Sequence, residues 1–441
     1  MRVKELPRDD DDCGWIHTAA MGNDRPIRRL SSDLQVDAAI VGAGFTGLAI
    51  ARRLARRQPD WRIAVLDAQR AGFGASGRCS GFVVDQASFV AAMPAESANR
   101  FIALSRQGIR SLRDQVLHGR IDCDWDETGW LHGSATDAGR ASLEALERWL
   151  DARGEPYEHL DAAALARLTG SSYYREAIRM PGTVLIQPAA LMHGLVKGLP
   201  ESVRLFEQTP VYRLRRDSSQ GHGAWTLRAR GGSISAERVF VAVNGLLPQF
   251  GLHRQRLFPV WTFGSLTRPL SAEEEARLGS RRPWGLLAQD PLGSSVRRTA
   301  DGRLLIRNSV RFSRSATSSA AWRATAVRAH RQALEDRFPT LREIAFEHTW
   351  GGLMGMSRNG RHVFGSPAPG LWAAGGYNAA GIALGTISGE LLADAALGHE
   401  SPALDAMRAL PGPAWIPPEP FFGVGARWKI RQMETEAGSW I

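Results

Sequence analysis

One short stretch constrains the fold of this chain more than any other. It runs from Val36 to Asp67 and reads VDAAIVGAGFTGLAIARRLARRQPDWRIAVLD. Within it, Gly42, Gly44 and Gly47 form the pattern GxGxxG between a short apolar run and a helix-like run. A strand, a glycine turn and a helix in this order open a parallel sheet and bind the pyrophosphate of a dinucleotide. The stretch therefore predicts an α/β fold with a Rossmann-like domain.

Each glycine of the pattern has its own physical task. Gly42 permits the tight turn after the strand, Gly44 lets the backbone approach a pyrophosphate, and Gly47 lets the helix pack closely on the sheet. The start of the helix offers free N–H groups and the positive end of its dipole to phosphates. Asp67 ends the second apolar run, where a carboxylate can accept hydrogen bonds from both ribose hydroxyls. An acid at that point disfavours the 2′-phosphate of NADP.

Length and charge narrow the class of protein. A chain of 441 residues exceeds one ordinary core, so we expect about two domains. A net charge of +10 would suit a nucleic-acid partner, but lysine occurs only at Lys4, Lys197 and Lys429, and the arginines are scattered without a basic tract. We therefore expect biased residue usage and no nucleic-acid partner.

The cysteines and the terminus bear on location. Cys13, Cys79 and Cys123 are odd in number and far apart, which predicts neither a disulfide framework nor a metal site. The first residues are acidic and polar, unlike a signal peptide, and no apolar run is long enough to span a bilayer. We expect a cytoplasmic protein with no metal and no membrane span.

Three separated motifs resemble those of the D-amino-acid-oxidase-like FAD-dependent oxidoreductases, with the closer likeness to the γ-glutamylputrescine oxidoreductase branch. They read IVGAGFTGLAIARRLA at 40–55, GFGASGRCSGF at 72–82 and GLWAAGGYNAAGIALGTISGELLADAALG at 370–398. A weaker fourth is TWGGLMGMSRNGRHVFG at 349–365. The resemblance implies a Rossmann-like FAD-binding domain, a second β-sheet-rich substrate domain, and oxidation of a C–N bond with reduction of the flavin.

Motifs at the start, middle and end of the chain predict that the FAD-binding domain is discontinuous. We expect an N-terminal extension at 1–35, the FAD-binding domain at 36–90, 165–250 and 340–410, the substrate domain at 91–164 and 251–339, and a C-terminal tail at 411–441.

The resemblance and the glycine pattern together predict which residues contact FAD. They are Gly42, Gly44, Phe45, Thr46, Gly47, Asp67, Ala68, Gln69, Ala75, Ser76, Gly77, Arg78, Cys79, Ser80, Gly81, Val211, Ala242, Gly376, Asn378, Gly381, Ile382 and Ala383. The family's second motif usually reads GASGRNGG, so Cys79 and Ser80 depart from it. We expect FAD to be bound non-covalently, with a thioether through Cys79 as the alternative, because a free cysteine is more often a small buried hydrophobe.

Three residues are the candidates for catalysis. Arg307 falls on a strand whose alternation places it on one face with Leu305 and Ser309, where a buried guanidinium suits a carboxylate. Trp350 is a candidate aromatic wall that can hold an alkylammonium. Tyr377 lies in the closing glycine segment, the part of the third motif from Gly375 to Gly381, and is expected at the edge of the active site.

These observations predict oxidation of an amine or amino acid to an imine, which water hydrolyses to a carbonyl product. Oxygen is the expected electron acceptor and yields hydrogen peroxide. Some members of the family that the chain resembles use a lysine near the flavin to promote the reaction with oxygen. Residues 198–428 contain no lysine, so a dehydrogenase remains open. The alternatives are an FAD-dependent hydroxy-acid or polyol dehydrogenase and a flavin-containing RNA-modifying module. An NAD-dependent Rossmann dehydrogenase lacks support from the later motifs.

Overall fold

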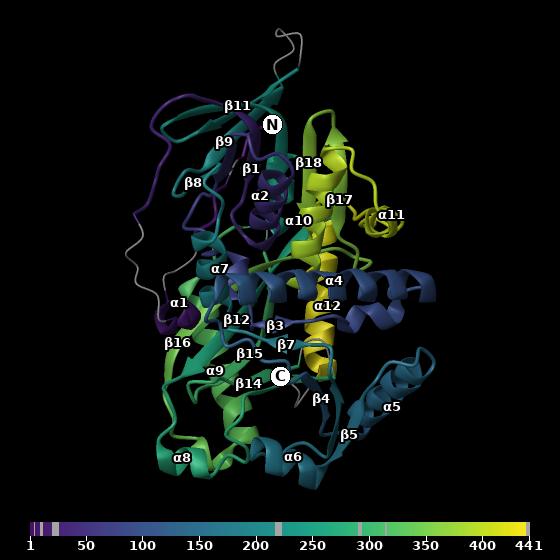
Figure 1. Ribbon diagram of the computed structural model, residues 1–441. Helices are drawn as coiled ribbons and strands as arrows, with labels where there is room; N and C mark the ends of the chain where they lie inside the picture. The colour runs from purple at the N-terminus through teal and green to yellow at the C-terminus, as the bar shows by residue number, and fades with distance from the viewer. Residues whose placement is uncertain are drawn as a thin grey trace.

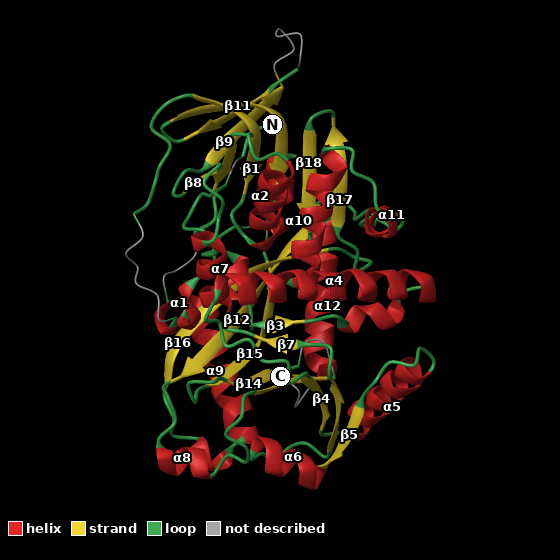
Figure 2. Cartoon of the chain, viewed as in Figure 1, coloured by secondary structure: helices red, strands yellow, loops and turns green. Residues whose placement is uncertain are grey.

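The computed structural model describes residues 1–3, 5–8, 12–19, 26–216, 223–289, 293–313 and 315–437. Its strands form two large sheets in two domains, which lie above and below the long helix α4 (Ala95–Gly119) in Figure 1. Helices cover both sheets (Figure 2). The predicted α/β fold with a second sheet-rich domain is confirmed.

The first sheet has eight strands, of which five run parallel at its centre. In spatial order these are β18 (Leu371–Gly375), β11 (Gly232–Val241), β1 (Leu34–Val41), β2 (Ile63–Leu66) and β8 (Val203–Phe206). The antiparallel strands are β17 (Val363–Ala368), β9 (Val211–Arg216) and β10 (Trp225–Ala229). The strand that carries the glycine pattern, β1, is central and buried on both faces, as a parallel strand must be.

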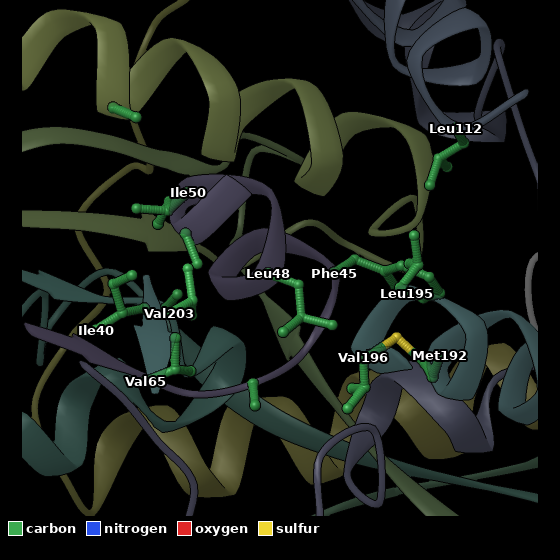
Figure 3. Close-up of a cluster of buried hydrophobic side chains, with 14 of the residues drawn as sticks. Ile40, Phe45, Leu48, Ile50, Val65, Leu112, Met192, Leu195, Val196 and Val203 are labelled. Carbon is green, nitrogen blue, oxygen red and sulfur yellow. The ribbon is translucent and has the colours of Figure 1, made fainter. Parts of the chain in front are cut away.

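Helices α2 (Phe45–Arg57), α7 (Pro188–Lys197) and α10 (Ala383–Ala396) cover one face of this sheet. Figure 3 shows the apolar cluster between them, where Ile40 and Val65 of the sheet meet Leu48 and Ile50 of α2 and Leu195 of α7. The helices α2 and α10 pack closely on each other, since a Cβ added to Gly389 would lie 2.4 Å from the carbonyl oxygen of Thr46. This contact brings the starts of both helices to the same edge of the sheet.

The second sheet also has eight strands and is mostly antiparallel. In spatial order they are β16 (Phe346–Met356), β12 (Phe258–Thr267), β15 (Leu304–Phe312), β14 (Ser295–Arg298), β13 (Trp284–Ala288), β4 (Trp130–Ser134), β6 (Glu176–Met180) and β5 (Glu158–Asp161). Helix α9 (Ala320–Arg337) packs on one face, and the opposite face is turned toward the first domain. Strands β6 and β16 pair here although they fall within 165–250 and 340–410, and the exact domain boundaries stay a prediction.

The remaining elements connect or cover the two sheets. They are α1 (Gly14–Thr18), α3 (Ala75–Arg78), the pair β3 (Phe82–Val83) and β7 (Val184–Leu185), η1 (Ser88–Ala92), α5 (Asp137–Asp151), α6 (Ala162–Thr169), η2 (Asn244–Phe250), α8 (Ala272–Ala276), η3 (Pro339–Leu341), α11 (Pro402–Arg408) and α12 (Phe421–Ala437). None of the helices in the described ranges combines the length and the apolar character that a bilayer crossing needs.

Candidate functional site

The glycine turn after β1 has the geometry that its sequence predicts. Gly42 has a φ of +104°, and a Cβ added there would lie 2.5 Å from the carbonyl oxygen of Ala242. A Cβ on Gly47 would lie 1.8 Å from the carbonyl oxygen of Gly42. No side chain other than hydrogen fits either position, so the start of α2 is held close to the end of β1.

The first turn of α2 is left open to an anion. Its N-cap is Gly44, and no described side chain caps it. The N–H of Phe45 donates to Ser76 Oγ at 3.2 Å, which joins the start of α2 to the short helix α3 of the second motif. Open backbone donors at a helix start and a glycine beside them fit the pyrophosphate of FAD.

Asp67 lies beside this turn, at the end of β2. One carboxylate oxygen accepts from the N–H of Ala43 at 2.8 Å, and the other accepts from the N–H of Gln69 at 2.9 Å. The carboxylate is thereby fixed next to the glycine turn, where a ribose is expected. Ala68 follows it directly, and the N–H of Thr209 donates to the Asp67 carbonyl oxygen at 2.8 Å.

Val211 and Ala242 lie on different sides of this region. Val211 opens β9 two residues after Thr209 and is buried. Ala242 follows β11 and donates its N–H to the carbonyl oxygen of Val41 at 2.8 Å. We expect their backbone groups to contact the adenine, and this role stays a prediction.

The second motif is fastened by two tryptophans. The indole N–H of Trp15 donates to the carbonyl oxygen of Cys79 at 2.8 Å, and that of Trp350 donates to the carbonyl oxygen of Arg78 at 2.9 Å. The two indoles meet edge to face with centroids 6.2 Å apart. Trp350 is therefore buried against the cofactor motif, and its expected role as a wall of the substrate site stays a prediction.

Arg78 is buried within the same motif. Its Nε donates to the carbonyl oxygen of Phe73 at 2.7 Å, and one terminal nitrogen lies 3.4 Å from the carbonyl oxygen of Gly351 on β16. The guanidinium thus links the second motif to the second sheet. Ala75 and Gly77 lie with Ser76 in the short helix α3 of this motif.

Cys79 lies beside the expected flavin but is poorly suited to react. Its Sγ is 3.5 Å from the carbonyl oxygen of Ser76, and burial raises the pKa of the thiol to about 11. Because the thiolate is the nucleophilic form, a thiol held protonated at neutral pH disfavours covalent attachment. Non-covalent binding stays a prediction.

A residue that the sequence did not reveal also holds this motif. Arg297 on β14 is 1% exposed, and one of its terminal nitrogens approaches the carbonyl oxygens of Ser80 at 3.0 Å, Gly81 at 3.3 Å and Ile186 at 2.6 Å. Its guanidinium also lies 5.2 Å from the ring centroid of Trp15. Burial lowers the pKa of Arg297 to about 10, which leaves it a cation at neutral pH beside the expected flavin.

Arg297 explains the glycine at position 81. Gly81 has a φ of +76°, and an added Cβ would lie 2.2 Å from the Arg297 nitrogen. No local pattern distinguishes Arg297 from the many other arginines of the chain, so only the pairing of β14 with β15 and the fold of the second motif bring it to this site.

The closing glycine segment forms a tight loop between β18 and α10. Gly376 has a φ of +74° and donates its N–H to Asn244 Oδ1 at 2.9 Å. Asn378 accepts from the N–H of Ser357 at 2.8 Å and donates to the carbonyl oxygen of Gly376 at 2.8 Å. The loop is thereby fixed at both the first and the second sheet.

This loop delivers the start of α10 to the same edge as the start of α2. The N-cap of α10 is Ile382, no described side chain caps it, and Gly381 and Ala383 flank that position. A fourteen-residue helix with open N–H groups fits the electron-rich edge of a flavin. Contact of these residues with FAD stays a prediction.

Tyr377 is buried in the loop. Its hydroxyl lies 2.9 Å from Thr46 Oγ1 on α2, and its ring stacks on His362 with centroids 5.8 Å apart. Burial raises the pKa of Tyr377 to about 12. The hydroxyl thus joins the closing segment to the first motif, and a catalytic role for Tyr377 stays a prediction.

Arg307 lies on the face of the second sheet that is turned toward the cofactor motifs. It pairs across from Gly264 and Ser295, and Leu305 on the same face packs with Trp15 and Trp350. Burial lowers the pKa of Arg307 to about 10, so it remains charged. Within the described residues, its guanidinium has no carboxylate partner.

One cluster of possible metal ligands lies away from these motifs. His348 Nδ1 is 3.1 Å from Asp12 Oδ1, and the ring of His348 stacks on that of His17 with centroids 4.8 Å apart and planes 2° from parallel. Nitrogens in parallel stacked rings do not point at one common atom, so this geometry does not form a metal site.

Residues 37–395 match the family model described as FAD dependent oxidoreductase. The chain is 28% identical over 396 residues to a probable oxidoreductase OrdL of Rhizobium meliloti, which covers 86% of this chain and 87% of that protein. It is 27% identical over 409 residues to γ-glutamylputrescine oxidoreductase of Escherichia coli, with coverage of 90% and 91%.

Solved structures share the fold. Glycine oxidase of Geobacillus kaustophilus superposes with a TM-score of 0.70 at 23% identity and covers 84% of this chain and 96% of its own. L-Proline dehydrogenase from P. horikoshii superposes with a TM-score of 0.68 at 15% identity, with coverage of 87% and 98%.

Proposed function

Because this chain belongs to the family of FAD-dependent oxidoreductases, we propose that it oxidises the C–N bond of an amine or amino acid. The substrate would lose two electrons and two protons to become an imine, and water would then add to release a carbonyl compound and an amine or ammonia. FAD supplies the two-electron acceptor for such a reaction. Oxygen would accept the electrons afterwards and form hydrogen peroxide.

The observation that carries the proposal is the position of Arg307. A half-buried cation without a carboxylate partner in the described structure lies on the same sheet face as the residues that fasten the cofactor motifs. A substrate carboxylate would pair with the guanidinium through two parallel hydrogen bonds. Such a pair would put the neighbouring amine on the cofactor side of the sheet, which favours a substrate that carries both groups.

The remaining residues would orient the cofactor and exclude water. The starts of α2 and α10 would hold the phosphates and the flavin edge, and Asp67 the ribose. Trp15 and Trp350 are each 2% exposed and close the face between the cofactor motif and the second sheet. A dry site suits transfer of electrons from a neutral amine, which needs orientation more than a strong base.

The relatives are consistent with this proposal. The names of two of them, γ-glutamylputrescine oxidoreductase and glycine oxidase, refer to molecules that contain amino and carboxyl groups. The match covers 91% of the length of the first of these relatives. We therefore propose the complete oxidation, and not a part of it, for this chain.

The experiment is anaerobic reduction of the bound flavin by a panel of compounds. We expect loss of the oxidised flavin absorbance with amino acids, N-methyl amino acids or amines that bear a carboxylate, and peroxide formation when oxygen is admitted. Reduction by 2-hydroxy acids or polyols, but by no amine, would instead favour a hydroxy-acid or polyol dehydrogenase. Reduction by NAD(P)H alone would refute amine oxidation.

A further inference from the structure

Helix α12 carries an apolar stripe that faces solvent. Phe421, Val424 and Trp428 are 73%, 65% and 66% exposed. Their spacing of three and four residues puts them on one face of the helix. Single exposed apolar residues are common, but an aligned set of large ones marks a contact surface.

The fold of α12 does not require this stripe. The opposite side of the helix already packs on the second domain, where the ring of Phe422 lies 4.9 Å from that of Phe258 and 5.5 Å from that of Phe312. Ile430 and Met433 pack against the core beneath the second sheet. In Figure 1, α12 is the yellow helix that crosses the level of α4 and runs on beside the strands of the second domain.

Positive charges border the stripe on both sides. Arg427 and Lys429 directly precede and follow Trp428, so each lies about 100° around the helix from it. Arg431 lies one turn further along, near the stripe. All three side chains are exposed, and the Arg427 guanidinium also lies 5.9 Å from the ring centroid of Phe312 on the second sheet. Aromatic and aliphatic residues bordered by Arg and Lys are typical of a helix that lies in a lipid interface.

We propose that α12 docks the protein onto an anionic lipid surface, with Phe421, Val424 and Trp428 in the interface and the three cations at the headgroup phosphates. Charge favours this occupant over a second copy of the chain. A two-fold contact through this face would bring the same three cations of both copies together, and each chain already carries a net charge of +10.

A cavity beside the start of α12 extends the apolar region. It has a volume of about 420 Å³, and Phe422, Pro418, Ile416 and Leu257 contribute to its lining. Two cations, Arg2 and Arg254, and one carboxylate, Glu419, also line it. The cavity therefore continues the apolar surface of the stripe, with one positive charge in excess among these three groups.

The test is flotation of the FAD-loaded protein with lipid vesicles. We expect binding to vesicles that contain phosphatidylglycerol and none to vesicles of phosphatidylcholine alone, with loss of binding as salt is raised. The charge variant Arg427→Gln/Lys429→Gln/Arg431→Gln should bind on the order of 100-fold more weakly. The stripe variant Phe421→Ser/Val424→Ser/Trp428→Ser should also release the vesicles.

The matched control is Leu117→Ser, because Leu117 on α4 is 64% exposed and lies on another element. It should bind vesicles as the unchanged protein does, and flavin absorbance should show that each variant is folded. The proposal is overturned if the unchanged protein ignores anionic vesicles or if the stripe variant still binds them. It is also overturned if light scattering finds a dimer that the stripe variant abolishes, since the face would then join two copies.

Discussion

At the residue scale, the site depends on buried cations that bridge the two domains. Arg78 reaches from the second motif to Gly351 of β16, and Arg297 reaches from β14 back to Ser80 and Gly81 of the second motif. Both donate to backbone carbonyl oxygens, so they position the segments expected to hold the flavin. Arg307 differs because its guanidinium makes no hydrogen bond or ion pair with the described residues, which leaves it available to a ligand.

Replacement of Arg297 should lower both the stability of the fold and the affinity for FAD. Arg297→Gln would leave the carbonyl oxygens of Ser80, Gly81 and Ile186 without their shared donor, at a cost of about 2–4 kcal/mol. Thermal unfolding and the FAD dissociation constant measure the two effects. The exposed Arg328→Gln on α9 is the control and should change stability by less than about 0.5 kcal/mol. Equal effects of both substitutions would contradict the bridging role.

Replacement of Arg307 should discriminate between substrates. Arg307→Gln should raise KM for an amino-acid substrate by roughly 10- to 100-fold, the value of a charge-assisted pair. For an amine without a carboxylate, KM should hardly change. Steady-state kinetics on such a matched pair of substrates gives the answer, and a uniform loss of kcat on both would argue against carboxylate recognition.

The thiol of Cys79 should be unreactive near neutral pH. Because burial raises its pKa to about 11, the thiolate is scarce below that pH, and alkylation at pH 8 should be roughly 100-fold slower than for a free cysteine. The rate should rise as the pH approaches 11. Mass spectrometry of the modified peptide follows it, and denatured protein should release all of its flavin. Flavin that stays on the polypeptide would show that a thioether forms.

At the element scale, three glycine-rich turns bring helix starts and backbone donors to one edge of the first sheet. The turn after β1 could be predicted from the sequence in detail, because its glycine spacing, apolar strand and acidic end follow from one local motif. The placement of the second sheet against the second motif could not be predicted. It depends on contacts between residues far apart in the chain, such as that of Arg297 with Gly81.

Two helices, α1 and α12, were not predicted from the sequence. The segment at 411–441 was expected to be a C-terminal tail, yet it contains α12, whose Gly423 and Gly425 weaken the helical pattern. Residues 1–35 were expected to be an extension without clear periodicity, yet α1 places Trp15 against the second motif. A five-residue helix is too short to produce a periodic signal.

Substitution of Gly42 by alanine tests the junction of β1 and α2, because it adds a single methyl group there. Gly42→Ala should cost about 2 kcal/mol or more, because its φ of +104° and the carbonyl oxygen of Ala242 both exclude a Cβ. The purified protein should also lose most of its FAD. Gly412→Ala is the matched control, since an added Cβ there meets nothing within 4 Å. The ratio of flavin to protein absorbance compares them, and full FAD content in Gly42→Ala would contradict the assigned turn.

At the scale of the whole molecule, the two domains contribute different parts of the candidate site. The first sheet gathers the starts of α2 and α10 at one edge, and the second sheet supplies Arg297, Arg307 and Trp350 from the opposite side. The family and its cofactor could be recognised from separated motifs, because those motifs are the segments expected to contact a group that the family shares. The substrate could not, because the residues that would face it come from strands without a shared pattern.

The central claim, oxidation at a C–N bond, is tested most directly by the rate at which a deuterated amine reduces the bound flavin without oxygen. Deuterium on the carbon next to the nitrogen should slow the loss of flavin absorbance several-fold, and the product should be the corresponding carbonyl compound. A colourless protein that takes up no FAD, or a flavin that no amine reduces, would contradict the account.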